Sequence, residues 1–489
     1  MSQNWTNYYE GMEITKNLDL TIEFIRSIQG EYEISNLPFK DRKGAMAVKG
    51  RHLELNFMLS LRESLDSLRI IDVNEFCVRN VQTGNNFLVP NRSGILSGTT
   101  NLMGDEDAEC PYTIKISNMM ECGWNKDDRY FYRFLLPIEK EYWSGDINTL
   151  VYHYKRSYSR GLIPVQFDSG TIHIYPVHIE QLHYMAIESR FACSYDEMQK
   201  YIYAISLSLG LVTSVVTFDY AYVFASVNDD FEKDMYCGFS EMRNSIKGQY
   251  RFFTTNMYSL ETALKYNKTE YALAQIYDKN GQVISNLQDW MQLDEFERLV
   301  KMLYGNDNLA RAVLILIESS TFALDYEGAM CAVALETICS ALDKSKQSTF
   351  LTNDNWQKLV IPEFENTIYQ LLEHGTISEE HAAAMRKKLN GLNMPTNGDK
   401  LSVPFENCGY TLSKSEKEVI KKRNRFLHGH IIGHSYEEAY KEILYSCLEL
   451  QKLCSILLFR EADFNGYILN NAVLVGLEQA IKVKEPLLI

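Results

Sequence analysis

The sequence predicts an α+β protein, with a β-rich N-terminal domain at residues 1–290 and an all-α domain at residues 291–489. Two observations support this division. Up to about residue 225, short segments of alternating apolar and polar residues, or of β-branched residues, are separated by turn-forming clusters such as QTGNN at 82–86. From Leu293 onward, the apolar residues recur with the spacing of amphipathic helices.

The strand pattern of the N-terminal region covers 31–38, 52–59, 68–81, 112–120, 130–138 and 170–179. Strands at this spacing favour an antiparallel sheet or a sandwich. Ser194 and Glu197 form a capping box, so we expect a helix there that ends near Gly210. A strand at 215–225 should follow it.

The helical pattern of the C-terminal region covers 293–305, 308–323, 326–342, 355–375 and 378–391, and a proline is expected to kink or split the fourth of these. A looser segment at 392–411 separates them from two further helices. Ser415 with Glu418, and Ser435 with Glu438, have the spacing of capping boxes and should open those last two helices. The first of them should end at Gly429.

Composition limits the classes of function. The chain has 489 residues and a formal net charge of −15, so its overall field repels nucleic acid and anionic lipid. RNA binding therefore requires a local basic patch, and no DNA or membrane partner is expected. The cysteines form no C-x-x-C pair, and the N-terminus lacks the pattern of a signal peptide. These features indicate a cytoplasmic protein.

The segment IKKRNRFLHGHIIGH at 420–434 concentrates cations and histidines. One interpretation is a zinc site made by His428, His430 and His434. The helix break at Gly429 argues against three ligands on one rigid element, so we predict no metal and no other cofactor. A second interpretation is a basic phosphate-binding site. A third is a solvated helix face whose cations favour the helix C-terminus.

A separate group of histidines, His173, His178 and His183, recurs every five residues in one strand-like stretch. Alternation along a strand would place successive members on opposite faces. A shared metal site is therefore not expected there.

The R-N-x-x-x-H pattern from Arg423 to His428 resembles the signature of HEPN domains, and A-L-E-T at 334–337 resembles their A-L-E element. A long helix and an FNGYI segment at 464–468 follow the motif. Together with the β-rich N-terminal half, this arrangement resembles the ApeA-like HEPN proteins of bacteria. The resemblance implies a HEPN-like helical bundle at 291–489 and a sensor or regulatory domain at 1–290.

The resemblance implies a metal-independent endoribonuclease of antiphage defence that acts as a toxin by abortive infection, with tRNA as one candidate substrate and a phage-derived trigger. In such chemistry the RNA 2′-hydroxyl attacks the adjacent phosphorus, giving a 2′,3′-cyclic phosphate. His428 would transfer protons, Arg423 would hold the phosphate, and Asn424 would orient it. Accessory or substrate-binding roles are predicted for Arg425, Lys422 and Glu336.

Helix geometry suggests that one chain does not complete this site. Positions 423 and 428 lie roughly 140° apart on an ideal helix, whereas Asn424 and His428 share a face. We therefore expect a homodimer through the helical domain, or a larger assembly, with a composite site at its axis. The alternatives remain a non-catalytic dimerisation or nucleotide-binding module, and an Arg423 that merely pairs with Glu418 or Glu336.

Overall fold

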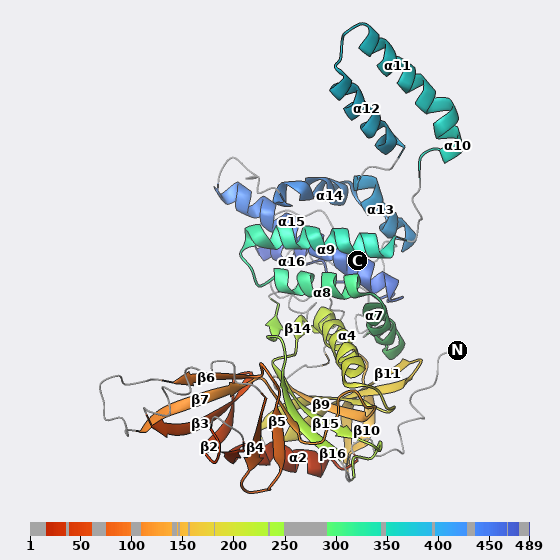
Figure 1. The fold of residues 1–489 in the computed structure, drawn as a ribbon. Coiled ribbons are helices and arrows are strands. Elements are labelled where there is room, and N and C mark those ends of the chain that lie inside the picture. The colour runs from red at the N-terminus through yellow and green to blue at the C-terminus, as the bar shows by residue number, and fades with distance from the viewer. Residues whose placement is uncertain are drawn as a thin grey trace. The chain divides into compact units, whose positions relative to one another are not determined.

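The computed structural model describes residues 16–35, 39–60, 75–98, 109–138, 144, 147–154, 157–179, 181–232, 235–248, 291–343, 349–393, 397–427, 436–466, 468–478 and 489. The chain divides into two compact units (Figure 1). One comprises Met1–Ala310 with Ala462–Leu469 and Leu488–Ile489, and the other comprises Arg311–Glu461 with Asn470–Leu487. A β-rich region is thus followed by a helical region, as the predicted α+β class requires.

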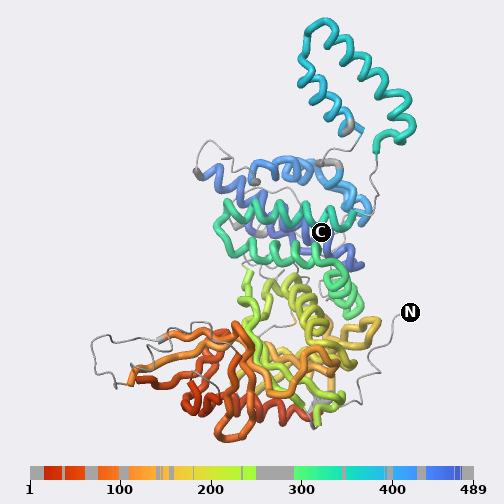
Figure 2. The backbone as a smooth tube through the Cα atoms, viewed as in Figure 1, coloured from red at the N-terminus to blue at the C-terminus, as the bar shows by residue number. Residues whose placement is uncertain are grey.

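The first unit is built on an antiparallel sheet, and the tube in Figure 2 shows its strands in red to green. Over the described residues it has 15 strands in the order β10-β11-β12-β13-β9-β15-β16-β8-β5-β4-β1-β2-β3-β7-β6, and β14 pairs separately with β17. The strands are β1 (Gly30–Ile34), β2 (Lys43–Lys49), β3 (His52–Ser60), β4 (Phe76–Asn80), β5 (Asn86–Val89), β6 (Gly94–Gly98), β7 (Glu109–Ile116), β8 (Asn118–Glu121), β9 (Phe131–Pro137), β10 (Leu150–Tyr154), β11 (Ser157–Phe167), β12 (Gly170–Ile179), β13 (Leu182–Ser189), β14 (Val215–Val216), β15 (Tyr220–Ser226), β16 (Met235–Glu241) and β17 (Ile246–Lys247).

Alternation of apolar residues explains why the predicted strands form. In β3, Leu53, Leu55, Phe57 and Leu59 all point into the core, while the intervening residues are more exposed. The strands predicted at 52–59, 130–138 and 170–179 are confirmed. The one predicted at 112–120 is interrupted at Ser117, so that β7 and β8 pair with different neighbours.

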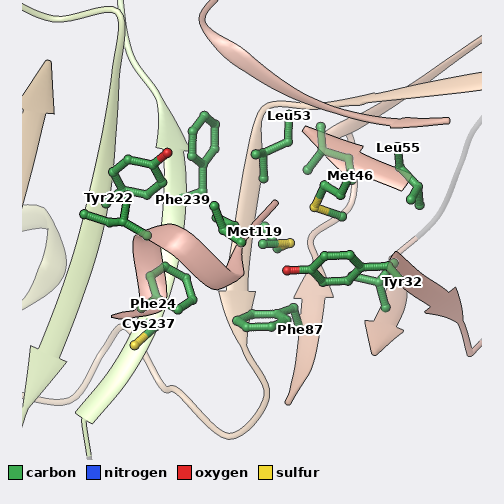
Figure 3. Packing of buried hydrophobic residues seen from close by; sticks show 14 of the residues in the cluster. Phe24, Tyr32, Met46, Leu53, Leu55, Phe87, Met119, Tyr222, Cys237 and Phe239 are labelled. Carbon is green, nitrogen blue, oxygen red and sulfur yellow. The ribbon is translucent and has the colours of Figure 1, made fainter. Parts of the chain in front are cut away.

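A helix that the pattern analysis missed packs against this sheet. Helix α2 (Leu18–Ser27) buries Phe24, whose ring lies 5.5 Å from that of Phe224 and 6.0 Å from that of Phe87. Figure 3 shows Phe24 among core side chains contributed by several strands. The labelled members are Phe24, Tyr32, Met46, Leu53, Leu55, Phe87, Met119, Tyr222, Cys237 and Phe239.

The prediction for the histidines of the first unit was wrong in one respect. Residues 173–183 do not form one strand but a hairpin of β12 and β13, in which His178 pairs directly with His183. The Nδ1 atoms of these two side chains lie 2.5 Å apart. His173 points to the other side of the sheet and is buried, so the structure does not bring all three together.

Helix α4 (Tyr195–Thr213) begins at the predicted capping box, in which Ser194 and Glu197 satisfy each other's backbone N–H groups. Helix α7 (Leu293–Gly305) has the predicted bounds and packs against α4, with the rings of Tyr201 and Tyr304 stacked 4.6 Å apart. Although α7 was expected to open the second domain, it belongs to the first unit, and the division falls after Ala310.

The remaining helices are α8 (Asp307–Ser319), α9 (Leu324–Leu342), α10 (Asn353–Asn355), the π-helix η1 (Trp356–Val360), α11 (Ile361–Glu373), α12 (Glu379–Leu392), α13 (Asn397–Asn407), α14 (Lys414–Leu427), α15 (Tyr436–Glu461) and α16 (Asn471–Glu478). Within the second unit, α9 packs against α13, α14 and α15. Among the described residues, none of the helices is both long and apolar enough to cross a membrane.

Some predictions for this unit need correction. The segment at 392–411 was expected to be loose, yet it contains α13 with Pro404 inside the helix. The predicted helix at 355–375 is not split: α10, η1 and α11 follow one another without a break, and the π-helical turn comes directly before Pro362 in the first turn of α11. The capping box of α14 is made by Ser413 and Glu416, and not by Ser415 and Glu418.

Candidate functional site

The predicted site residues that the structure describes lie on two adjacent helices of the second unit. Lys422, Arg423, Asn424 and Arg425 lie near the C-terminal end of α14, and Glu336 lies on α9. The predicted catalytic residue His428, together with His430 and His434, lies outside the described residues.

A buried polar network fixes the first turn of α14. The Glu416 carboxylate accepts hydrogen bonds from the Ser413 backbone N–H and from the Tyr410 hydroxyl, each at 2.7 Å. It also forms an ion pair at 2.8 Å with Lys452 of α15, which pairs with Glu449 at 2.7 Å. All three charged side chains are almost completely excluded from solvent. This network sets the register of α14 on α15.

Close packing fixes the other end of α14. The Phe426 ring rests on Gly328 of α9, where a Cβ atom would come within 2.8 Å of the ring and 3.2 Å of the Cys447 Sγ atom. A residue larger than glycine would therefore push α14 and α15 away from α9. The turn that carries Arg423 and Asn424 is held against α9 by this contact.

Arg423 points inward. Its side chain is 5% exposed, and its Nε donates a hydrogen bond to Oε1 of Glu336 at 2.8 Å. Its Nη1 donates to the carbonyl oxygen of Ile420 at 2.8 Å. The Glu336 side chain is 40% exposed, so the ion pair lies at the edge of the α9–α14 interface. Of the pairings considered for Arg423, the structure has the one with Glu336.

The neighbouring motif residues face solvent. Asn424 and Arg425 are exposed, and Lys422 is half-buried in an ion pair with Glu442 of α15 at 2.8 Å. A planar guanidinium and a side-chain amide can both donate hydrogen bonds to phosphate oxygens. Among the described motif residues, Asn424 and Arg425 are thus the ones that an anion can reach directly in the single chain.

In the part of the chain that the structure describes, no three histidine, cysteine, aspartate or glutamate side chains are placed to hold a metal ion. The proposed zinc ligands His428, His430 and His434 lie outside that part. What the structure does bring together is an arginine and a glutamate from motif elements far apart in the sequence.

Sequence analysis did not identify the buried ion pairs of Lys452 with Glu416 and Glu449. Glu449 and Lys452 lie three residues apart on α15 and are fully buried. The available signal was a pair of opposite charges within an otherwise apolar stretch of that helix, because buried charges of this kind require partners.

Comparison of the chain with models of known families, with curated proteins and with solved structures found no match.

Proposed function

We propose that this protein is a metal-independent endoribonuclease of the HEPN type. The observation that carries this proposal is the 2.8 Å contact between Arg423 and Glu336. These residues belong to the R-N-x-x-x-H and A-L-E elements, the two sequence segments on which the resemblance depends. Their meeting at one helix interface is what a shared site requires. A purely structural Arg423–Glu336 pair would place them in the same way, so the cleavage test below is needed to separate the two.

The proposed chemistry divides the work among the motif residues. His428 takes the proton from the 2′-hydroxyl or delivers one to the leaving 5′-oxygen, since imidazole titrates near neutral pH. Asn424, which is exposed on α14, orients the phosphate. Arg423 supplies positive charge for the phosphorane, and its ion pair with Glu336 must loosen for a phosphate oxygen to reach the guanidinium.

A second copy of the chain completes the site in this proposal. The surface of α9 beside Glu336 carries Tyr326 and Val333, which are 69% and 38% exposed, with the half-buried Met330 between them. Their spacing of four and three residues puts them on one helix face, together with Glu336. An apolar helix face next to the motif suits a dimer contact that would bring two copies of the motif together.

The wider biological role rests on the resemblance alone. We propose that the β-rich unit senses a trigger, such as a phage product, and that RNA cleavage (with tRNA as one candidate) then arrests the infected cell. The protein would act in the cytoplasm.

The test is incubation of the purified protein with total cellular RNA in EDTA, followed by mapping of the cut ends. The proposal predicts cleavage with 2′,3′-cyclic phosphate ends, and no cleavage by the His428→Ala or Asn424→Ala variants. Glu380→Ala, an exposed change on α12, is the matched control and should cleave normally.

A second candidate is a non-catalytic dimerisation or nucleotide-binding module. The burial of Arg423 favours it, because the hydrogen bonds of its guanidinium to Glu336 and to the Ile420 carbonyl give it a structural role that needs no substrate. This candidate predicts that Asn424→Ala and His428→Ala variants keep the dimer and the full cellular effect of the protein.

A further inference from the structure

The solvent face of α14 carries a strip of cations. Lys414, Lys417, Lys421 and Arg425 are all exposed. They are separated by three or four residues, and this spacing places them on one face of a helix. With a rise of 1.5 Å per residue, the strip is roughly 16 Å long. We call these four residues the α14 strip.

Among the described residues, the strip differs from the other cations of the same helix in having no ion-pair partner. Lys422 pairs with Glu442, and Arg423 pairs with Glu336. Within the described part of the chain, no carboxylate lies within ion-pair distance of a strip residue. Glu418 is the one acidic residue among the exposed residues of this face, and it too makes no ion pair there.

Of the four strip residues, only Arg425 lies in the last turn of α14, where the helix dipole favours a cation. Lys414 and Lys417 lie in the first turn of α14, where the helix dipole disfavours positive charge. Lys417 with Lys421, and Lys421 with Arg425, are like charges four residues apart, which repel by a few tenths of a kcal/mol per pair. A bound anion would reverse both effects.

The geometry points to the phosphate backbone of RNA as that anion. We propose that the α14 strip binds a few nucleotides of the substrate strand without sequence preference and leads it to Asn424 on the same helix. A chain with a net charge of −15 needs a local basic surface to hold RNA at all, and these cations provide one. The strip contains no apolar side chain, which a membrane-binding helix face would require.

This inference rests on the proposed function, because the strip is assigned to the same substrate. Its test uses the full chain carrying His428→Ala, so that the RNA stays intact. Binding of a fluorescent, unstructured single-stranded RNA in EDTA is measured by anisotropy over a range of salt concentrations. The test variant adds Lys414→Gln, Lys417→Gln and Lys421→Gln. The matched control adds Lys387→Gln, Lys388→Gln and Lys400→Gln, which are exposed lysines of α12 and α13.

The strip variant should bind at least tenfold more weakly at low salt. Its plot of log affinity against log salt should be less steep by about 2, since each cation contributes about 0.7 on single-stranded nucleic acid. The control should match the parent protein. Glu418→Gln should bind more tightly than the parent, because it removes the negative charge from the strip.

Equal affinity and salt dependence in the parent and the strip variant would overturn the inference, as would an equal loss in the control. A parent that binds polyglutamate but not RNA would also overturn it and would indicate an acidic protein partner. Cleavage by the protein with native His428, measured in parallel, separates the two claims. If RNA binds through the strip but is not cleaved, the proposed nuclease activity is refuted, while the inference that the strip binds RNA stands.

Discussion

The guanidinium Nε of Arg423 donates a hydrogen bond to the Glu336 carboxylate at 2.8 Å, which joins residues 87 positions apart in the sequence. The bond ties the C-terminal half of α14 to the middle of α9. It neutralises a charge that is almost wholly shielded from water, and it leaves the carboxylate partly exposed. The same contact therefore has a structural role and a place in the proposed site.

The structural role predicts that Glu336→Ala destabilises the second unit. The change leaves the buried Arg423 charge without its carboxylate. Because Glu336 is 40% exposed, water can replace part of the lost interaction, and we expect a loss of about 1–2 kcal/mol. Urea unfolding followed by helical circular dichroism measures it. Glu418→Ala, on the exposed face of α14, should change stability by less than about 0.5 kcal/mol. Equal stability of the two variants would show that the ion pair contributes nothing.

The network at the start of α14 predicts a larger effect for Lys452→Met. This change removes the buried cation that pairs with both the Glu416 and the Glu449 carboxylate, and we expect a loss of about 3–5 kcal/mol. Lys441→Met is the matched control on the same helix, because its pair with Glu437 is exposed and should contribute about 0.5 kcal/mol or less. Thermal unfolding of both variants gives the comparison. A Lys452→Met protein as stable as the control would contradict the described network.

Glu327 predicts a pH dependence of stability. Burial between α9 and α15 raises the pKa of its carboxyl to about 7, from an ordinary value of 4.5, while the Gln451 amide donates to it at 2.7 Å. The folded state therefore holds a proton that the unfolded state releases between these two values. Stability should fall as pH rises from about 4.5 to beyond 7, by roughly 3.5 kcal/mol at most, since each pKa unit corresponds to about 1.4 kcal/mol.

The Glu327→Gln variant checks this prediction. Its amide is neutral at every pH and fits the same space beside Gln451, so its stability should decline less than that of the parent between about pH 5 and pH 8. The measurement is the urea midpoint at several pH values. Parallel profiles for the two proteins would mean that Glu327 does not hold its proton in the folded state.

Local patterns were sufficient for much of the fold. The bounds of α7 and β12, and the capping box that opens α4, agree with the sequence analysis because each depends on residues next to one another in the chain. The β12–β13 hairpin was missed because the two residues between its strands, Glu180 and Gln181, are not turn formers. Its strands pair through register on a buried sheet, and no short sequence pattern encodes that register.

At the start of α14, tertiary contacts determine which residue caps the helix. Ser413 with Glu416, and Ser415 with Glu418, both have capping-box spacing, and no local preference separates them. Glu416 caps the helix because its carboxylate also receives Lys452 and the Tyr410 hydroxyl in the core. Helix α13 forms despite Pro404 in the same way, since it buries Leu401 and Phe405.

The candidate site was predictable in part. Sequence analysis named Glu336 both as an accessory residue and as a partner of Arg423, and the structure has that pairing. The burial of Arg423 was not predictable, because the phase of α14 against α9 is fixed by Phe426 on Gly328 and by the network around Lys452. The same orientation of α14 about its axis explains why Asn424 and Arg425 are exposed.

The central claim is that His428 and Arg423 cut RNA without a metal. The most direct measurement is the rate at which the full-length protein cleaves RNA in EDTA, compared with that of the His428→Ala variant. The account predicts cleavage that EDTA does not inhibit, with 2′,3′-cyclic phosphate ends, and a rate at least a hundredfold lower in the variant. Equal rates in the two proteins, or complete loss of the parent's cleavage in EDTA, would contradict it.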